Sequence, residues 1–148
     1  MGGKITFLTD GKSRSVPLAW KSKTIQQVCK SVKTAETRSL DLGIEDSLYL
    51  ARTVKEIYSG HSQKNSGQID VTLKIDSKTL IDTLKSTKQV QEKTVRHVVA
   101  WMKQQIDEGK VKSIDWLCSK EQLADVLTKH GVKTEHILKI LKAGRIDH

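Results

Sequence analysis

The sequence predicts an α/β fold with one mixed sheet and helices on its faces. Two strand-like stretches joined by an Asp-Gly turn open the chain, which indicates an antiparallel hairpin. Residues 69–75 then alternate apolar and polar side chains, and longer stretches repeat apolar residues every three or four positions. A hairpin followed by strand–helix units is typical of a mixed sheet. With 148 residues, of which 36% are hydrophobic, the chain is long enough for a single domain over residues 1–148.

The predicted hairpin begins with a strand at residues 4–8. Residues 10–15, with the sequence DGKSRS, are predicted to form its turn. Residues 16–20 and 24–29 are then predicted to form one long second strand, which a bulge could interrupt.

The longest helical pattern covers residues 33–58. Its apolar side chains fall on one stripe, which consists of Leu40, Ile44, Leu48, Ala51 and Val54. One turn further back the stripe reaches Glu36, a carboxylate in the first turn of the predicted helix. An unpaired carboxylate in the core would be expensive. Glu36 therefore either binds cations or a metal ion, or is stabilised by the helix dipole alone.

The stretch around which the chain is organised is residues 68–84. Ile69, Val71, Leu73 and Ile75 predict a strand with one buried face. The alternation stops at Asp76, and Ser77 suits the N-cap of a helix. Asp76 therefore lies at the carboxyl end of a strand, where ligands and metal ions bind in open α/β sheets. The alternative is that Asp76 only caps the helix.

The second half of the chain predicts three more helices and one strand. Residues 92–108 form an amphipathic helix that Gly109 ends, and residues 111–118 form a strand. A capping-box spacing from Ser119 to Gln122 begins a helix at residues 120–129. The last helix covers residues 134–141, and residues 143–148 are expected to be frayed.

The net charge predicts a polyanionic partner. The chain has 26 Lys and Arg against 17 Asp and Glu, a formal charge of +9, and such a basic chain favours nucleic acid. The residues predicted to contact phosphates lie on the hairpin, around one tryptophan, and on the helix at 92–108: Lys12, Arg14, Trp20, Lys21, Lys23, Lys30 and Arg96. The alternative for the hairpin cations is a solvated edge strand whose lysines block edge pairing.

The cysteines and the hydropathy pattern predict an intracellular protein, in the cytoplasm or the nucleus. Cys29 and Cys118 lie far apart and form no metal-binding spacing, so a reducing compartment is expected. We find no signal peptide and no apolar run long enough for a membrane span, and we expect no membrane partner.

Three acids stand out as candidate metal ligands. Glu36, Asp76 and Asp125 each lie at the end of an element or within an apolar stretch. Clustered carboxylates repel one another and are best tolerated around divalent cations. Two magnesium or manganese ions held by such a cluster can activate water and stabilise the leaving oxygen of a phosphodiester. Together with the basic surface, this pattern predicts a nuclease.

The sequence resembles the ribonuclease H domain at the end of copia-type retrotransposon polyproteins, over about residues 3–144. Three stretches carry the resemblance: PLAWKSKTIQQVCKSVKTAETRSLDLGIEDSLYL, LKIDSKTLIDTLKSTK and IDWLCSKEQLADVLTKHG. The family implies a ribonuclease H-like fold and divalent-metal hydrolysis of the RNA strand of RNA–DNA hybrids. It also implies catalytic and metal-binding roles for Glu36, Asp76 and Asp125.

One departure from the family bears on activity. Family members begin with a central strand that carries an Asp bridging both metals, and the chain lacks a counterpart of this segment. The resemblance therefore implies an N-terminally truncated fold with an open sheet edge. Asp10 is a candidate substitute ligand, although Asp-Gly favours the hairpin turn.

Three functions stay open. The first is a metal-dependent ribonuclease whose remaining ligand comes from Asp10, a partner chain or water. The second is a catalytically dead, retroelement-derived module that binds nucleic acid. The third is a structural subunit of a larger assembly, in which a protein partner or self-association covers the open sheet edge.

Overall fold

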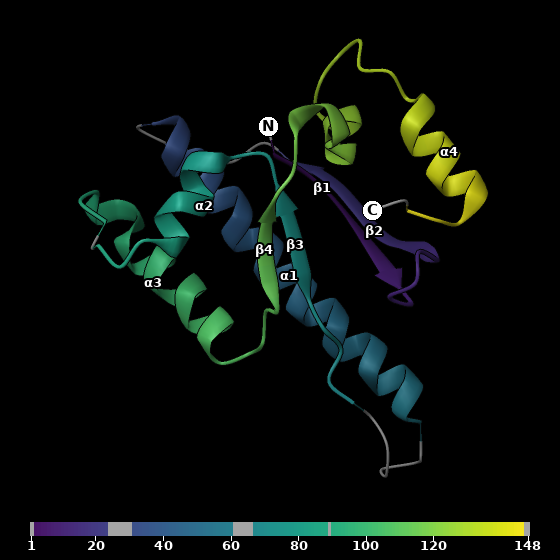
Figure 1. The fold of residues 1–148 in the computed structure, drawn as a ribbon, viewed down its shortest axis with the longest axis horizontal. Helices are drawn as coiled ribbons and strands as arrows, with labels where there is room; N and C mark the ends of the chain where they lie inside the picture. Colours follow the sequence, from purple (N-terminus) through teal and green to yellow (C-terminus); the bar gives the residue numbers. More distant parts are fainter. Residues whose placement is uncertain (1, 24–30, 61–66, 89, 147–148) are drawn as a thin grey trace. The chain divides into compact units, whose positions relative to one another are not determined.

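The computed structural model describes residues 2–23, 31–60, 67–88 and 90–146. The chain is a mixture of helices and short strands, as predicted (Figure 1). It groups into two compact units, and the single-domain prediction stays a prediction. The hairpin unit consists of Met1–Gln26 and Lys120–His148, and the central unit consists of Gln27–Ser119. Among the described residues, no helix combines the length and the apolar character that crossing a membrane requires.

The hairpin unit begins with two antiparallel strands, β1 (Gly2–Thr9) and β2 (Ser15–Lys23). The pairing register shifts between Thr6 and Phe7, which pair with Ala19 and Pro17, so an irregularity lies at Leu18, earlier on the second strand than the bulge that the sequence allowed between residues 20 and 24. The turn is closed by Asp10, whose Oδ1 accepts hydrogen bonds from the backbone N–H groups of Lys12 at 2.8 Å and Arg14 at 3.1 Å. The predicted turn is therefore confirmed. Residues 24–29, predicted to extend the second strand, lie outside the described residues.

The predicted α-helix at residues 120–129 is wrong. The chain instead forms two short 3₁₀ helices, η1 (Ser119–Glu121) and η2 (Leu123–Leu127), and Gln122 makes no side-chain cap bond. The apolar residues of η2 recur at spacings of three and four, so their pattern is compatible with a 3₁₀ helix as well as with an α-helix. This segment also lies very close to β1: a Cβ on Gly3 would be 2.9 Å from the carbonyl oxygen of Ala124.

The C-terminal helix α4 (Glu135–Ala143) ends at Gly144, which has a left-handed conformation. Residues 143–148 were predicted to be frayed, and this prediction is wrong for residues 143–146, which are ordered. The carbonyl oxygen of Gly144 accepts a hydrogen bond from the Ser15 N–H at 2.8 Å, and the Ile146 N–H donates to the Ser13 carbonyl at 2.9 Å. Backbone pairing to the hairpin turn therefore orders this segment.

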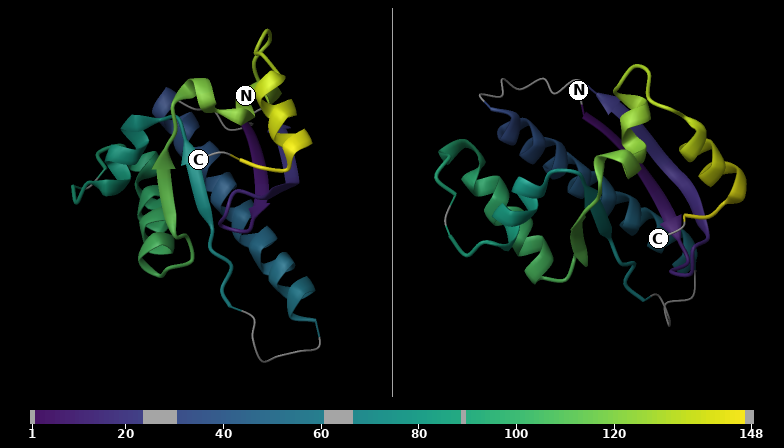
Figure 2. Two further views of the ribbon diagram at one scale, coloured as in Figure 1. Left: turned by 45° about the vertical axis from the view of Figure 1, so that its right-hand side comes forward. Right: turned by 45° about the horizontal axis from the view of Figure 1, so that its top comes forward.

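The central unit is built on α1 (Val32–Ser59), whose N-cap Ser31 accepts from the Thr34 N–H. Strand β3 (Thr72–Ile75) pairs in parallel with β4 (Ser113–Trp116). Helix α2 (Lys78–Lys85) follows β3, and α3 (Lys93–Asp107) precedes β4. Helix α1 runs along this sheet and contacts β3 (Figure 2). The core consists of apolar side chains from α1, α2, α3, β4 and the turn after α3: Leu40, Ile44, Leu80, Ile81, Met102, Val111 and Ile114. Strand β3 packs against this core with partly buried side chains.

The strands pair differently from the prediction of one mixed sheet. Within the described residues they form two two-stranded sheets, β1–β2 in the hairpin unit and β3–β4 in the central unit. Strand β3 is also shorter than predicted and begins at Thr72. The ladder is extended by two further bonds, from the Lys112 N–H to the Val71 carbonyl at 2.8 Å and from the Leu117 N–H to the Ile75 carbonyl at 2.7 Å. Among the described strands, β3 has a partner on one edge only, so its other edge lacks a ladder of backbone hydrogen bonds.

Candidate active site

The candidate active site lies where β3 ends and α2 begins. Ser77 is the N-cap of α2, as predicted, and its Oγ accepts a hydrogen bond from the Leu80 N–H at 3.3 Å. The hydroxyl of Ser77 also donates to Glu36 Oε2 at 2.6 Å. A donor–acceptor distance this short is typical of a hydroxyl bonded to an ionised carboxylate. One side chain therefore joins α1 to the start of α2, across 41 positions of sequence.

Glu36 is half-buried, but it does not continue the core stripe of α1. Its neighbours Thr34 and Thr37 take those buried positions instead, with Thr37 fully buried. The prediction that Glu36 lies in the first turn is also wrong, because α1 begins at Val32 and its first turn holds no acidic residue. Helix-dipole stabilisation falls off beyond the first turn, so the Ser77 hydroxyl is the contact that explains the position of Glu36.

Asp76 is exposed and directly precedes the cap residue. Ser77, rather than Asp76, caps α2, so the alternative reading of Asp76 as a cap is wrong. Its backbone carbonyl accepts a hydrogen bond from the indole Nε1–H of Trp116 at 3.3 Å. The structure thus places the Asp76 backbone between β3, α2 and the end of β4, and leaves its carboxylate at the surface.

Asp125 belongs to the hairpin unit, on η2. Its Oδ2 accepts a hydrogen bond from Lys129 Nζ at 2.7 Å, and its side chain is 17% exposed. Asp10 lies in the same unit, where the two amide bonds of the turn occupy its Oδ1. Of the predicted ligands, Glu36 and Asp76 therefore belong to the same unit, where Glu36 accepts a hydrogen bond from the residue that follows Asp76.

The described residues contain no group of three or more His, Cys, Asp or Glu side chains that could hold a metal ion. Glu36 and Asp76 provide carboxylate oxygens, which are the donors that Mg²⁺ prefers. Magnesium is commonly bound by one or two protein carboxylates and completes its shell with water and substrate phosphate. The two-metal site predicted from the sequence therefore needs ligands beyond these two carboxylates.

The predicted nucleic-acid contacts divide between the two units. Lys12, Arg14, Lys21 and Lys23 are exposed in the hairpin unit, and the Trp20 side chain there is 67% exposed. Lys30 lies outside the described residues.

Arg96 lies in the central unit and has a structural contact that the sequence did not indicate. Its Nε donates to the Val90 carbonyl at 3.0 Å, which fixes the segment before α3.

The hairpin carries a further cation that sequence reasoning did not single out. Lys4 lies directly opposite Lys21 in the β1–β2 register. Partial burial and the charge of Lys21 lower the pKa of Lys4 below its usual value. Like charges placed opposite each other destabilise a strand pair. A phosphate group beside these two lysines would relieve that repulsion. The pairing of Lys4 with Lys21 follows from the strand register, which the sequence did not define because neither the turn length nor the register shift was known.

Comparison with protein-family models finds no match for this chain, and neither do comparisons with curated proteins and with solved structures. The resemblance to ribonuclease H domains therefore stays a prediction from the motifs around Glu36, Asp76 and Asp125.

Proposed function

We propose that this protein is a ribonuclease H-like, divalent-metal-dependent endonuclease that hydrolyses the RNA strand of RNA–DNA hybrids. The observation that carries the proposal is the 2.6 Å bond from the Ser77 hydroxyl to Glu36. This bond holds Glu36, one predicted ligand, against Ser77, the residue directly after the other predicted ligand, Asp76. Glu36 and Ser77 are 41 positions apart in the sequence.

Magnesium fits the proposed site as a single ion bound by Glu36 and Asp76. When bound, the ion would lower the pKa of a coordinated water and stabilise charge on the leaving oxygen. The protein contributes the placement of the two carboxylates: the Ser77 hydroxyl fixes the first, and the strand–helix junction fixes the backbone of the second. Within this proposal, a partner chain or water is the candidate for a further ligand.

The charge distribution supports a nucleic-acid substrate. The formal charge of +9 favours binding to phosphates, and the exposed cations of the hairpin unit provide a surface for the sugar–phosphate backbone. An RNA–DNA hybrid would be recognised by its shape and by the 2′-hydroxyl groups of its RNA strand.

A second candidate is a module that binds nucleic acid without cutting it. It is favoured by the contacts of the two remaining acids, because Asp125 is paired with Lys129 and Asp10 closes a turn. The single-sided pairing of β3 within the described residues adds a place where a protein partner or a second copy could add a strand.

The test is cleavage of an end-labelled RNA–DNA hybrid in EDTA, in Mg²⁺ and in Mn²⁺. Glu36→Gln and Asp76→Asn are compared with Glu56→Gln, an exposed acid on the same helix about 30 Å further along at 1.5 Å per residue. We expect metal-dependent cutting that each site variant lowers at least about 100-fold, because loss of even a supporting contact costs 10- to 100-fold. Glu56→Gln should cut like the wild type.

Other outcomes separate the two candidates. If the wild-type protein cuts with neither metal but binds the hybrid with an affinity that falls steeply as salt rises, the non-catalytic module is correct. If it neither cuts nor binds, both nucleic-acid functions are wrong. Equal cutting by all variants would place the chemistry away from Glu36 and Asp76.

A further inference from the structure

Trp116 is an exposed aromatic residue next to the candidate active site, and no sequence argument assigned it a role. It is the last residue of β4 and lies opposite Ile75, the last residue of β3, in the parallel register. Two residues earlier on the same strand, Ile114 is 7% exposed, whereas Trp116 is 53% exposed. The strand therefore changes from core to surface within two positions, at the edge where Asp76 lies.

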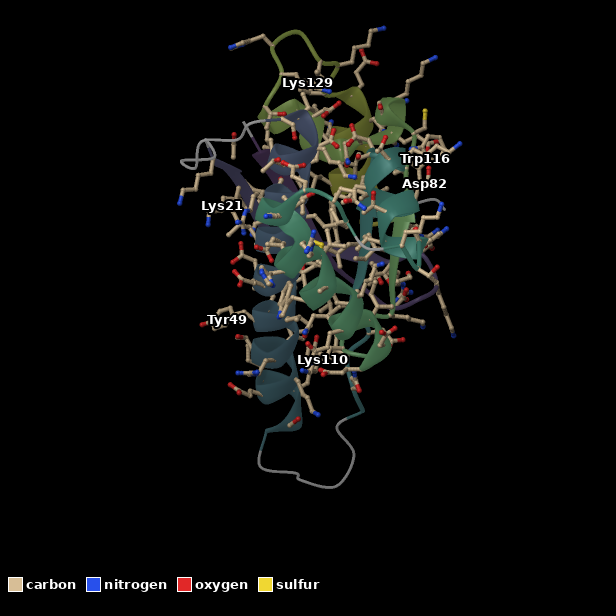
Figure 3. The ribbon with its side chains drawn as sticks, turned by 90° about the vertical axis from the view of Figure 1, so that its left-hand side faces the viewer. Lys21, Tyr49, Asp82, Lys110, Trp116 and Lys129 are labelled. Carbon is tan, nitrogen blue, oxygen red and sulfur yellow. The ribbon has the colours of Figure 1, made fainter. Side chains whose placement is uncertain are left out.

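The indole is oriented by a hydrogen bond to the backbone of the candidate site. Its Nε1–H donates to the Asp76 carbonyl at 3.3 Å, and β4 contacts α2. Figure 3 labels Trp116 and, on the opposite side of the view, Tyr49 of α1. An oriented ring loses little further freedom when a ligand packs on it, which favours binding.

We propose that Trp116 is a nucleotide-binding residue, and that its indole packs against the base or sugar of a nucleotide whose phosphate lies at Asp76. This inference rests on the proposed function and adds a contact to the same site. Aromatic rings are the usual surface on which bases stack, and they do so with little regard to sequence. An exposed carboxylate alone would repel a phosphate, so a nucleotide here needs both a cation and an apolar contact. The exposed part of the indole is the apolar contact.

The experiment measures binding in Ca²⁺, which supplies a cation between Asp76 and the phosphate and is not expected to support cutting, for a single-stranded RNA and for an RNA–DNA hybrid of the same sequence. The variants are Trp116→Ala, Trp116→Phe and the control Tyr49→Ala, which removes another exposed aromatic side chain of the central unit, 69% exposed. We expect Trp116→Ala to weaken binding about tenfold, as base–aromatic contacts do, and Trp116→Phe to retain most of the affinity. Tyr49→Ala should bind like the wild type. A larger effect on the single strand would indicate stacking on an unpaired base, and a larger effect on the hybrid would indicate packing on a sugar.

Fluorescence gives an independent test if Trp116→Ala fails to fold. Nucleic acid should quench the emission of the wild-type protein more than that of Trp116→Phe, and the difference is the signal of Trp116 itself. Unchanged affinity in a folded Trp116→Ala, or no difference in quenching, overturns the inference.

The two proposals can fail separately. A Trp116-dependent affinity without cleavage would overturn the hydrolytic function and support nucleotide binding. Cleavage that does not depend on Trp116 would support the hydrolytic function and overturn the binding role of Trp116.

Discussion

Ser77→Ala should weaken both the fold and the candidate site, because one hydroxyl makes two contacts. Loss of the N-cap bond to the Leu80 N–H costs about 1 kcal/mol. Loss of the charged bond to Glu36 costs about 1.5 kcal/mol, the lower end for such bonds, since Glu36 is half-buried and water can partly replace the donor. The sum is about 2.5 kcal/mol of unfolding free energy, or about 5–10 °C in Tm for a chain of this size.

Two further substitutions separate these contributions. Glycine is nearly as good an N-cap as serine, so Ser77→Gly should lose mainly the Glu36 bond, about 2 kcal/mol in all. Ser77→Thr retains a hydroxyl and should stay within about 0.5 kcal/mol of the wild type. Urea denaturation of each variant gives the free energies of unfolding.

A double-mutant cycle between Ser77→Ala and Glu36→Ala measures the bond itself. We expect a coupling energy of about 1–1.5 kcal/mol, since the first substitution leaves the second with no bond to break. A coupling below about 0.5 kcal/mol, the level seen for independent sites, would refute the conclusion that Ser77 holds Glu36 in place.

The structure makes two further stability predictions. Burial and the charge of Glu45 raise the pKa of Asp41 above its usual 3.8, against the opposing effect of Arg38, so folding disfavours the ionised carboxylate. The cost of ionising Asp41 in the folded protein is absent well below pH 3.8 and complete above the pKa of the folded state. Asp41→Asn should therefore raise the free energy of unfolding at pH 7, and this gain should disappear as the pH is lowered. A less stable variant at pH 7 would mean that the Arg38 pair is worth more than the penalty. Gly3→Ala should destabilise the hairpin unit by about 1–3 kcal/mol in thermal unfolding, because the new Cβ would meet the backbone oxygen of Ala124 at 2.9 Å. A neutral effect would show that η2 can move away from β1.

Local patterns predicted most elements closely. The apolar stripe predicted a helix at residues 33–58, and α1 covers Val32–Ser59. The N-cap at Ser77 and the helix end at Gly109, where φ is +69°, were also correct, because each depends on the residue's own backbone chemistry.

The errors occurred where distant contacts decide the structure. The segment around η2 lies against β1 at Gly3, and residues 144–146 pair with the hairpin turn. Neither contact leaves a periodic signal in the sequence, because the partners are more than 100 positions apart.

The candidate site was predicted in part for the same reason. The end of an alternating strand placed Asp76 correctly, since that signal is local. The bond that holds Glu36 comes from Ser77, 41 positions away, and was not predictable from spacing. The exposure of Trp116 was not predicted from the sequence, because it depends on the strand ending at this residue, two positions after the buried Ile114.

The most direct test of the proposed site is where Mn²⁺ binds. Mn²⁺ broadens the NMR signals of nuclei near it, so titration of the wild-type protein should broaden the backbone amide signals of Glu36 and of Asp76 to Lys78 first. Glu36→Gln with Asp76→Asn should abolish this broadening, and the control Glu56→Gln should retain it. Broadening confined to other acids, or none at these residues, would contradict the central claim that Glu36 and Asp76 form a divalent-cation site.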